Sequence, residues 1–152
     1  MFEFFAPLSG KVMELNEVPN QVFASKMAGD GVAIDSVDDL VLSPADGQIA
    51  FILKSNHAFC MKLNNGILVI VHIGIDTVQL NGDGFERLVE DGAEVKAGDP
   101  IIKIDRKKII GKGYSLITPV LITNMELVNE ISYKTNRDAV SGSEVILTYT
   151  TK

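Results

Sequence analysis

His57 and His72 are the residues best suited to chemistry in this chain of 152 residues, which contains no other histidine. Between them lies Asn64-Asn65-Gly66, whose Asn-Asn and Asn-Gly pairs tolerate positive φ and favour two-residue hairpin loops. A two-residue loop at 64–65 would place the two imidazoles directly opposite each other, with roughly 4.5–5.5 Å between their Cβ atoms. A loop at 65–66 would place them diagonally, at about 7–8 Å. In both cases the rings lie on the same face of the sheet. A three-residue loop would put them on opposite faces. The turn residues therefore predict a paired-histidine site.

Two adjacent imidazoles could carry a phosphoryl group. Because nearby cations repel, at least one ring is neutral at pH 7 and offers a nucleophilic nitrogen. The second ring could donate a hydrogen bond to the negative phosphoryl oxygens. Ser55 could fix the tautomer of His57, and Asp76 could supply negative charge or orient a partner near His72. Structural histidines packed in the core are the alternative.

A metal site is a competing hypothesis for the same residues. His72 and Asp76 have the H-x-x-x-D spacing of some zinc peptidases, and His57 could be a third ligand. Those enzymes also need an H-x-H element, for which the chain has no further histidine. We therefore expect no cofactor and no native metal, although His57 and His72 could bind zinc incidentally or share it with a partner.

Composition limits the class of partner and the compartment. The net charge of −6 and the pI near 4.8 argue against nucleic acid or an anionic membrane and favour a basic protein surface. The longest apolar run, 67–73, is far below the roughly 20 residues of a membrane span. The single cysteine, Cys60, is expected to be buried and reduced. We expect one cytoplasmic domain, residues 1–152, with no direct membrane insertion.

Short β-rich runs alternate with Gly, Pro, Asn and Asp about every 8–12 residues, which is typical of an all-β sandwich or barrel. Segment 6–12 recurs as 43–49, and segment 98–102 resembles 142–146. We therefore expect a compact antiparallel β-sandwich or barrel with a quasi-duplicated motif. The expected helices are few and short: 85–90, 106–110 and 125–132. Pro19 disfavours regular structure in the stretch that it opens.

Several longer motifs occur together in this chain. They include APLSG at 6–10, MAGDGVAI at 27–34, SPADG at 43–47, NHAF at 56–59, HIGIDTV at 72–78, GDGF at 82–85 and VKAGD at 95–99. Through these motifs the chain resembles the glucose-class enzyme IIA component of the bacterial phosphoenolpyruvate-dependent sugar phosphotransferase system. The resemblance covers nearly the whole chain, in order and at the spacing of that family.

The resemblance implies an antiparallel β-sandwich and a phosphotransferase that relays phosphoryl groups during sugar uptake. His72 matches the histidine that accepts phosphate from the histidine phosphocarrier protein and passes it to the cysteine of a sugar-specific IIB domain. His57 matches the histidine that stabilises this phosphate. Ser55 keeps a hydroxyl where the family commonly has threonine, and Gly74 matches the backbone position that holds the other nitrogen of the His72 ring.

A partner-binding surface is also implied. Its expected residues are Val22, Phe23, Met27, Leu53, Phe59, Ile70 and Val78. Asn20 stands where the family often has an acidic residue that faces basic groups of partners. No amphipathic leader of the kind found in some members is seen, so we expect no membrane tethering. The alternative function is a non-catalytic regulatory module that acts on transporters or kinases through the same face.

Overall fold

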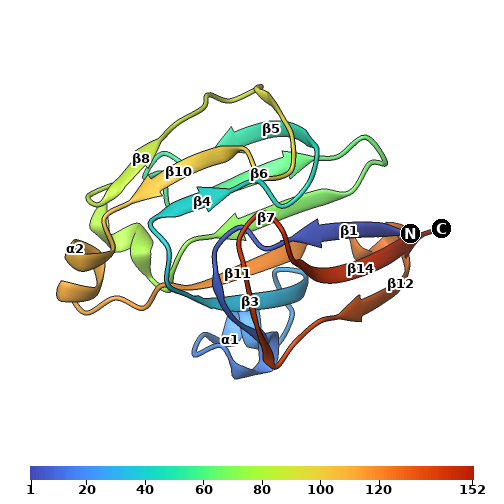
Figure 1. The fold of residues 1–152 in the computed structure, drawn as a ribbon, viewed down its shortest axis with the longest axis horizontal. Coiled ribbons are helices and arrows are strands. Elements are labelled where there is room, and N and C mark those ends of the chain that lie inside the picture. Colours follow the sequence, from blue (N-terminus) through green and yellow to red (C-terminus); the bar gives the residue numbers. More distant parts are fainter.

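The computed structural model describes residues 1–152 and consists mainly of antiparallel β-sheet (Figure 1). The strands are β1 (Phe2–Phe5), β2 (Gly10–Glu14), β3 (Asp30–Ser36), β4 (Leu40–Leu42), β5 (Gly47–Ile52), β6 (Ala58–Lys62), β7 (Leu68–His72), β8 (Phe85–Arg87), β9 (Glu94–Val95), β10 (Pro100–Ile104), β11 (Ile117–Ile122), β12 (Val128–Tyr133), β13 (Arg137–Ala139) and β14 (Val145–Thr151). The helical elements are α1 (Gln21–Ala24), α2 (Arg106–Gly111) and the 3-10 turns η1 (Leu15–Glu17), η2 (Thr77–Leu80) and η3 (Met125–Leu127).

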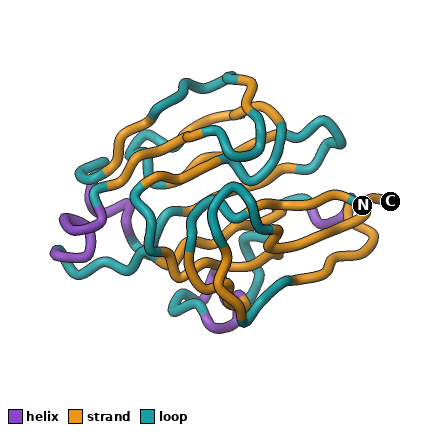
Figure 2. Tube along the Cα trace, viewed as in Figure 1, coloured by secondary structure: helices purple, strands orange, loops and turns teal.

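The strands form one large sheet and two small ones. The eight-stranded sheet has the order β13-β2-β3-β11-β7-β6-β5-β9, and the three-stranded sheets have the orders β1-β14-β12 and β4-β10-β8. In Figure 1, β4, β8 and β10 share the upper half of the molecule with β5 and β6, while β1, β12 and β14 lie below with β3 and β11. The helical turns lie at the edges (Figure 2). A cluster of 32 buried residues forms the core, so the prediction of a compact antiparallel β-sandwich is confirmed.

The internal repeat corresponds to repeated structure. Segments 6–9 and 43–46 are loops that lead into β2 and β5. In each loop the backbone carbonyl of the first residue accepts a hydrogen bond from a glycine in a distant turn. The N–H of Gly98 donates to the Ser43 carbonyl at 2.9 Å, and the N–H of Gly142 donates to the Ala6 carbonyl at 2.9 Å. The predicted quasi-duplication is therefore visible in the hydrogen bonds that close the sandwich.

One of the three predicted helices is confirmed. α2 covers 106–110, and the Asp105 side chain caps it by accepting from the Lys108 N–H at 3.2 Å. The helix predicted at 85–90 is wrong, because β8 begins there and pairs with β10. The helix predicted at 125–132 is limited to the single turn η3, and the rest is β12. In both places, pairing with a distant strand overrides local preference.

The predicted register of the β6–β7 hairpin is wrong. Ala58, and not His57, is opposite His72, and the Leu63 N–H donates to the Ile67 carbonyl at 2.9 Å. The loop therefore contains three residues, 64–66, with Gly66 at φ 88°. In this register strand alternation alone would separate the two rings. His57, however, precedes β6 and is not bound by that alternation.

Two further points concern the exposure of Cys60 and the length of the helices. Cys60 is free, as expected, but it is partly exposed in the middle of β6, so the expectation that it is buried is wrong. No helix of the structure is long and apolar enough to cross a membrane.

Candidate functional site

The imidazole rings of His57 and His72 lie edge to face, with their centroids 5.1 Å apart and their planes at 82°. His72 is the last residue of β7, and His57 ends the turn between β5 and β6. The backbone N–H of Ile73 donates to the His57 carbonyl at 2.7 Å, which joins the two segments directly beside the rings. His57 is 4% exposed, whereas His72 is only partly buried. The site thus has one accessible ring and one buried ring.

The tautomer of His72 follows from its hydrogen bond. Its Nδ1 lies 2.8 Å from the Gly74 carbonyl oxygen. A carbonyl only accepts, so Nδ1 carries the proton and Nε2 of the neutral ring keeps a free electron pair. Gly74 itself is at φ 82°, and a Cβ there would lie 2.5 Å from Thr77 Cγ2 and 2.6 Å from the Ser115 carbonyl oxygen. Only glycine fits at the position that orients His72.

His57 is oriented by Ser55. The Ser55 Oγ lies 2.5 Å from His57 Nδ1, and a hydroxyl can donate to that nitrogen. With Ser55 as donor, the ring proton of His57 is at Nε2. The pair then combines one nucleophilic nitrogen, on His72, with one N–H donor, on His57.

Burial lowers the pKa of both histidines. The pKa of His57 falls to about 4, first because burial disfavours the imidazolium and second because of repulsion from His72. The pKa of His72 is also lowered by burial, which outweighs the opposing effects of the Gly74 hydrogen bond and the Asp76 charge. At neutral pH both rings are therefore uncharged.

An aromatic side chain closes one side of the site. Phe23, on α1, is 8% exposed and its ring centroid lies 5.0 Å from that of His72. The helix begins because the Asn20 side chain accepts from the N–H groups of Val22 and Phe23 at 3.0 and 3.4 Å. The prediction that Pro19 disfavours regular structure in this stretch is therefore wrong, because α1 begins two residues after it. An asparagine N-cap was the missed signal.

The predicted partner-binding residues divide by exposure. Val22, Met27 and Val78 are exposed at 47%, 76% and 52%, whereas Leu53 and Ile70 are partly buried. Phe59 is 0% exposed and lies in the core opposite Val71, so it cannot contact a partner directly and its assignment is corrected.

Phe51 is a residue that the sequence analysis missed. It is 45% exposed and is paired with Cys60, which is paired with Ile70, so all three lie on the face of the sheet that carries His72. A bulge between Ile49 and Phe51 shifts the alternation along β5. That bulge has no clear sequence signal, which explains the omission.

The structure does not assemble a three-ligand metal site at the histidines. Asp76 is exposed, has φ 60° and precedes η2. No group of three or more His, Cys, Asp and Glu side chains comes together in a way that could hold a metal ion. Asp76 therefore contributes charge near His72 and does not complete a zinc triad with the two histidines.

Comparisons with known proteins agree on one family. Residues 2–128 match the family described as phosphoenolpyruvate-dependent sugar phosphotransferase system, EIIA 1. The chain is 43% identical over 149 residues to the PTS system glucose-specific EIIA component of Borreliella burgdorferi, covering 98% of this chain and 78% of that protein. It is 44% identical over 140 residues to the PTS system N-acetylglucosamine-specific EIICBA component of Escherichia coli. That match covers 92% of this chain but 22% of the relative, so the chain spans about a fifth of that protein's length.

A solved structure gives the same result for the fold. Glucose permease IIA from Mycoplasma capricolum matches with a TM-score of 0.85 at 31% identity. The match covers 96% of this chain and 94% of that one. The two proteins therefore share the fold over nearly their whole length.

Proposed function

The chain belongs to the EIIA 1 family of the phosphoenolpyruvate-dependent sugar phosphotransferase system, and from this premise we propose that His72 carries the phosphoryl group. Family membership makes the chain a phosphotransferase component that acts as a phosphoryl relay in sugar uptake. The observation that supports His72 is the hydrogen bond of its Nδ1 to the Gly74 carbonyl at 2.8 Å. It leaves Nε2 as the nucleophilic atom on the more accessible of the two rings.

The proposed reaction is an in-line displacement between two histidines. The electron pair of His72 Nε2 forms a bond to phosphorus while the N–P bond of the donor breaks, and the electrons of that bond stay on the donor nitrogen. A donor ring protonated at its other nitrogen leaves as a neutral imidazole. His72 keeps the proton on Nδ1, which donates to the Gly74 carbonyl oxygen throughout, so no proton has to leave the site.

His57 is proposed to stabilise the transferred phosphoryl group. The ring centroids of His57 and His72 are 5.1 Å apart. The Nε2–H of His57 can therefore reach and donate to an oxygen of a phosphoryl group bound to His72. Ser55 holds the opposite nitrogen at 2.5 Å, so the donor is oriented before the phosphate arrives. Added negative charge on His72 will raise the pKa of His57 from its low value and strengthen this hydrogen bond.

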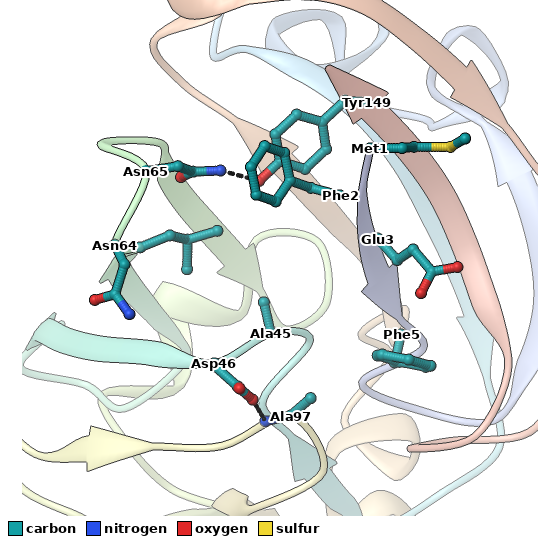
Figure 3. Close-up of a pocket in the computed structure, with 11 residues that line it drawn as sticks. Met1, Phe2, Glu3, Phe5, Ala45, Asp46, Asn64, Asn65, Ala97 and Tyr149 are labelled. Carbon is teal, nitrogen blue, oxygen red and sulfur yellow. Dashed lines mark hydrogen bonds between the residues drawn. The ribbon is translucent and has the colours of Figure 1, made fainter. Parts of the chain in front are cut away.

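The shape of the surface favours a protein as the donor. Five surface hollows of the molecule are lined by neither His57 nor His72. One of them, of about 350 Å³, lies at the other end of the β6–β7 hairpin, between the loop residues Asn64 and Asn65 and the N-terminal strand (Figure 3). His72 instead contacts Phe23 of α1, and Ile73 next to it accepts a hydrogen bond from Thr77 of η2. These two elements and the turn after α1 carry the exposed apolar side chains Val22, Val78 and Met27, an arrangement suited to docking another protein.

The proposed partners follow from the family. A phosphocarrier and a IIB domain are implied by membership. We assign the histidine phosphocarrier protein as donor to His72 and the cysteine of a sugar-specific IIB domain as acceptor. Residues 1–152 are proposed to form one domain that works in the cytoplasm, where the unpaired Cys60 stays reduced.

Phosphorylation with a complete donor system tests the proposal. The protein is incubated with phosphoenolpyruvate, enzyme I and the phosphocarrier, and intact mass and the modified site are determined at alkaline pH. One acid-labile phosphate on His72 is expected in the wild type and none in His72→Gln. His57→Gln should still accept phosphate but transfer it more slowly. Phosphate on His57 in the wild type, or on any residue of His72→Gln, would contradict the assignment.

A further inference from the structure

The turn 53–57, which carries Ser55 and His57, is held from outside the site by an arginine at the end of β8. Arg87 Nε donates to Asn56 Oδ1 at 2.8 Å, and Arg87 Nη2 donates to the Leu53 carbonyl oxygen at 3.4 Å. The same Leu53 carbonyl accepts from the Asn56 N–H at 2.8 Å and so closes the turn. One guanidinium therefore holds the turn at Leu53, where it begins, and at Asn56, the residue before His57.

The chain segment after Arg87 fixes this arginine and the end of β5 together. Asp91 Oδ1 accepts from the Ile52 N–H at 2.8 Å. The carboxylates of Asp91 and Glu90 lie 3.9 and 3.7 Å from Arg87 Nη1. Asp91 thus connects the last residue of β5 to the arginine that holds the turn following it.

Asn56 is the residue in the turn whose conformation decides where His57 lies. Its φ is 60°, the left-handed region that asparagine tolerates better than most residues. This reversal comes immediately before His57, whose side chain would otherwise follow the alternation of β6 to the face opposite His72. Holding the Asn56 side chain therefore holds the geometry of the histidine pair.

We infer that Arg87, acting through Asn56, is a positioning residue for phosphoryl transfer, because it holds the turn that presents the His57 ring to His72. This inference rests on the proposed function of the two histidines. No hydrogen bond joins Arg87 to either histidine, so its role is indirect. A planar guanidinium can donate to two acceptors at a fixed spacing, whereas the single ammonium of lysine cannot reproduce that fork.

Two substitutions remove the contact from opposite sides. Arg87→Lys keeps the charge but loses the fork, and Asn56→Gly keeps access to positive φ but loses the acceptor oxygen. We expect each to slow phosphoryl transfer through His72 about ten-fold, since displacing a catalytic group by about 1 Å can cost about 10²-fold. The ¹⁵N NMR signals of the His57 ring should broaden and should no longer show the pattern of the Nε2–H tautomer. The double variant should be no slower than the slower single variant, because both remove one contact.

Arg137 provides the matched control. It is exposed on β13 and makes no side-chain hydrogen bond or ion pair, so Arg137→Lys should match the wild type in transfer rate and His57 spectrum. Wild-type rates and His57 signals in Arg87→Lys would overturn the inference, as would additive losses in the double variant. Slower transfer with unchanged His57 signals and a lower Tm would also overturn it, by showing only a loss of stability. A wild-type protein that takes no phosphate would instead refute the proposed function, while the His57 spectrum would still test the role of Arg87.

Discussion

The Ser55 hydroxyl lies 2.5 Å from Nδ1 of His57, and this contact is shorter than the 2.8 Å contact between His72 and Gly74. The two contacts have opposite polarity, because a hydroxyl can donate to a ring nitrogen whereas a carbonyl can only accept from one. The two rings therefore hold their protons on different nitrogens. This asymmetry allows two chemically identical side chains to take different roles.

Ser55→Ala should impair His57 without unfolding the protein. Ser55 is partly exposed, and its hydrogen bond contributes about 1 kcal/mol, so phosphoryl transfer should slow by roughly five-fold. Ser55→Thr keeps the hydroxyl and should retain wild-type transfer. Rapid-quench kinetics with phosphorylated carrier would measure both rates. Equal rates for Ser55→Ala and Ser55→Thr would show that the hydroxyl does not orient His57.

The pKa of His57, lowered to about 4, predicts a specific acid sensitivity. In the unfolded chain the ring takes up a proton near its ordinary pKa of 6.5. Between this pH and about 4 the unfolded state binds more protons than the folded state, so the free energy of unfolding decreases as the pH falls. Above about pH 6.5 the stability from this group is fully present. Urea unfolding at pH 7 and at pH 4.5 measures the loss.

His57→Gln is the comparison for that experiment. Glutamine does not titrate, so the variant should lose less stability than the wild type between pH 7 and pH 4.5. The ring signals of wild-type His57 should titrate with a midpoint near pH 4 in an NMR experiment. A midpoint near 6.5 would mean that burial and His72 do not disfavour the imidazolium.

The histidine pairing was predicted from the sequence, but the reason given for it was wrong. Asn64 and Asn65 do lie in the hairpin loop, yet the loop has three residues and places Ala58 opposite His72. The rings meet because Asn56 has φ 60° just before His57. A single asparagine can adopt either sign of φ, and here contacts with Arg87, distant in sequence, stabilise the positive one. Such long-range support is not visible in local sequence.

Most of the motifs that carry the resemblance to the family lie in loops and at strand ends, although MAGDGVAI runs into β3. They implied the same fold class and the same two histidines as the residue patterns. The exposure of side chains was harder to predict. Phe59 and Phe51 are both aromatic residues of the β5–β6 pair, but a bulge in β5 turns Phe51 outward while Phe59 packs in the core. The residues that the resemblance implied for the docking surface therefore included Phe59, which is buried, and omitted Phe51, which is exposed.

Gly74→Ala should destabilise the protein and release His72. The left-handed φ of 82° is unfavourable for alanine by about 1–2 kcal/mol. The added Cβ would also lie 2.5 Å from Thr77 Cγ2 and 2.6 Å from the Ser115 carbonyl oxygen, which adds about 1–3 kcal/mol of overpacking. Chemical denaturation and phosphorylation of His72 measure the two effects.

Gly98→Ala is the matched control for Gly74→Ala. Gly98 has φ 91°, and a Cβ there meets nothing within 4 Å. It should therefore show only the conformational cost of about 1–2 kcal/mol and keep full phosphorylation. Equal destabilisation by the two substitutions would rule out a packing requirement at Gly74.

Asn20→Ala should loosen the helix that carries Phe23. Loss of an asparagine N-cap costs about 1 kcal/mol, and hydrogen exchange at the Val22 and Phe23 amides should accelerate. Asn20→Asp keeps the capping oxygen and adds a negative charge beside the site. It should retain slow exchange and bind a basic phosphocarrier more tightly at low salt. Fast exchange in Asn20→Asp would show that the side-chain oxygen does not cap α1.

Val78→Asp should weaken docking while leaving the fold intact. Val78 is 52% exposed in η2, the turn that follows His72 along the chain, so a change there should alter stability by no more than about 0.5 kcal/mol. The KM for the phosphorylated carrier should increase because a desolvated carboxylate would replace an apolar contact. Val140→Asp tests the specificity of this effect, since Val140 is 56% exposed but follows β13, which β2, β3 and β11 separate from β7. Equal increases in KM for the two variants would show that added charge, rather than the surface beside His72, governs docking.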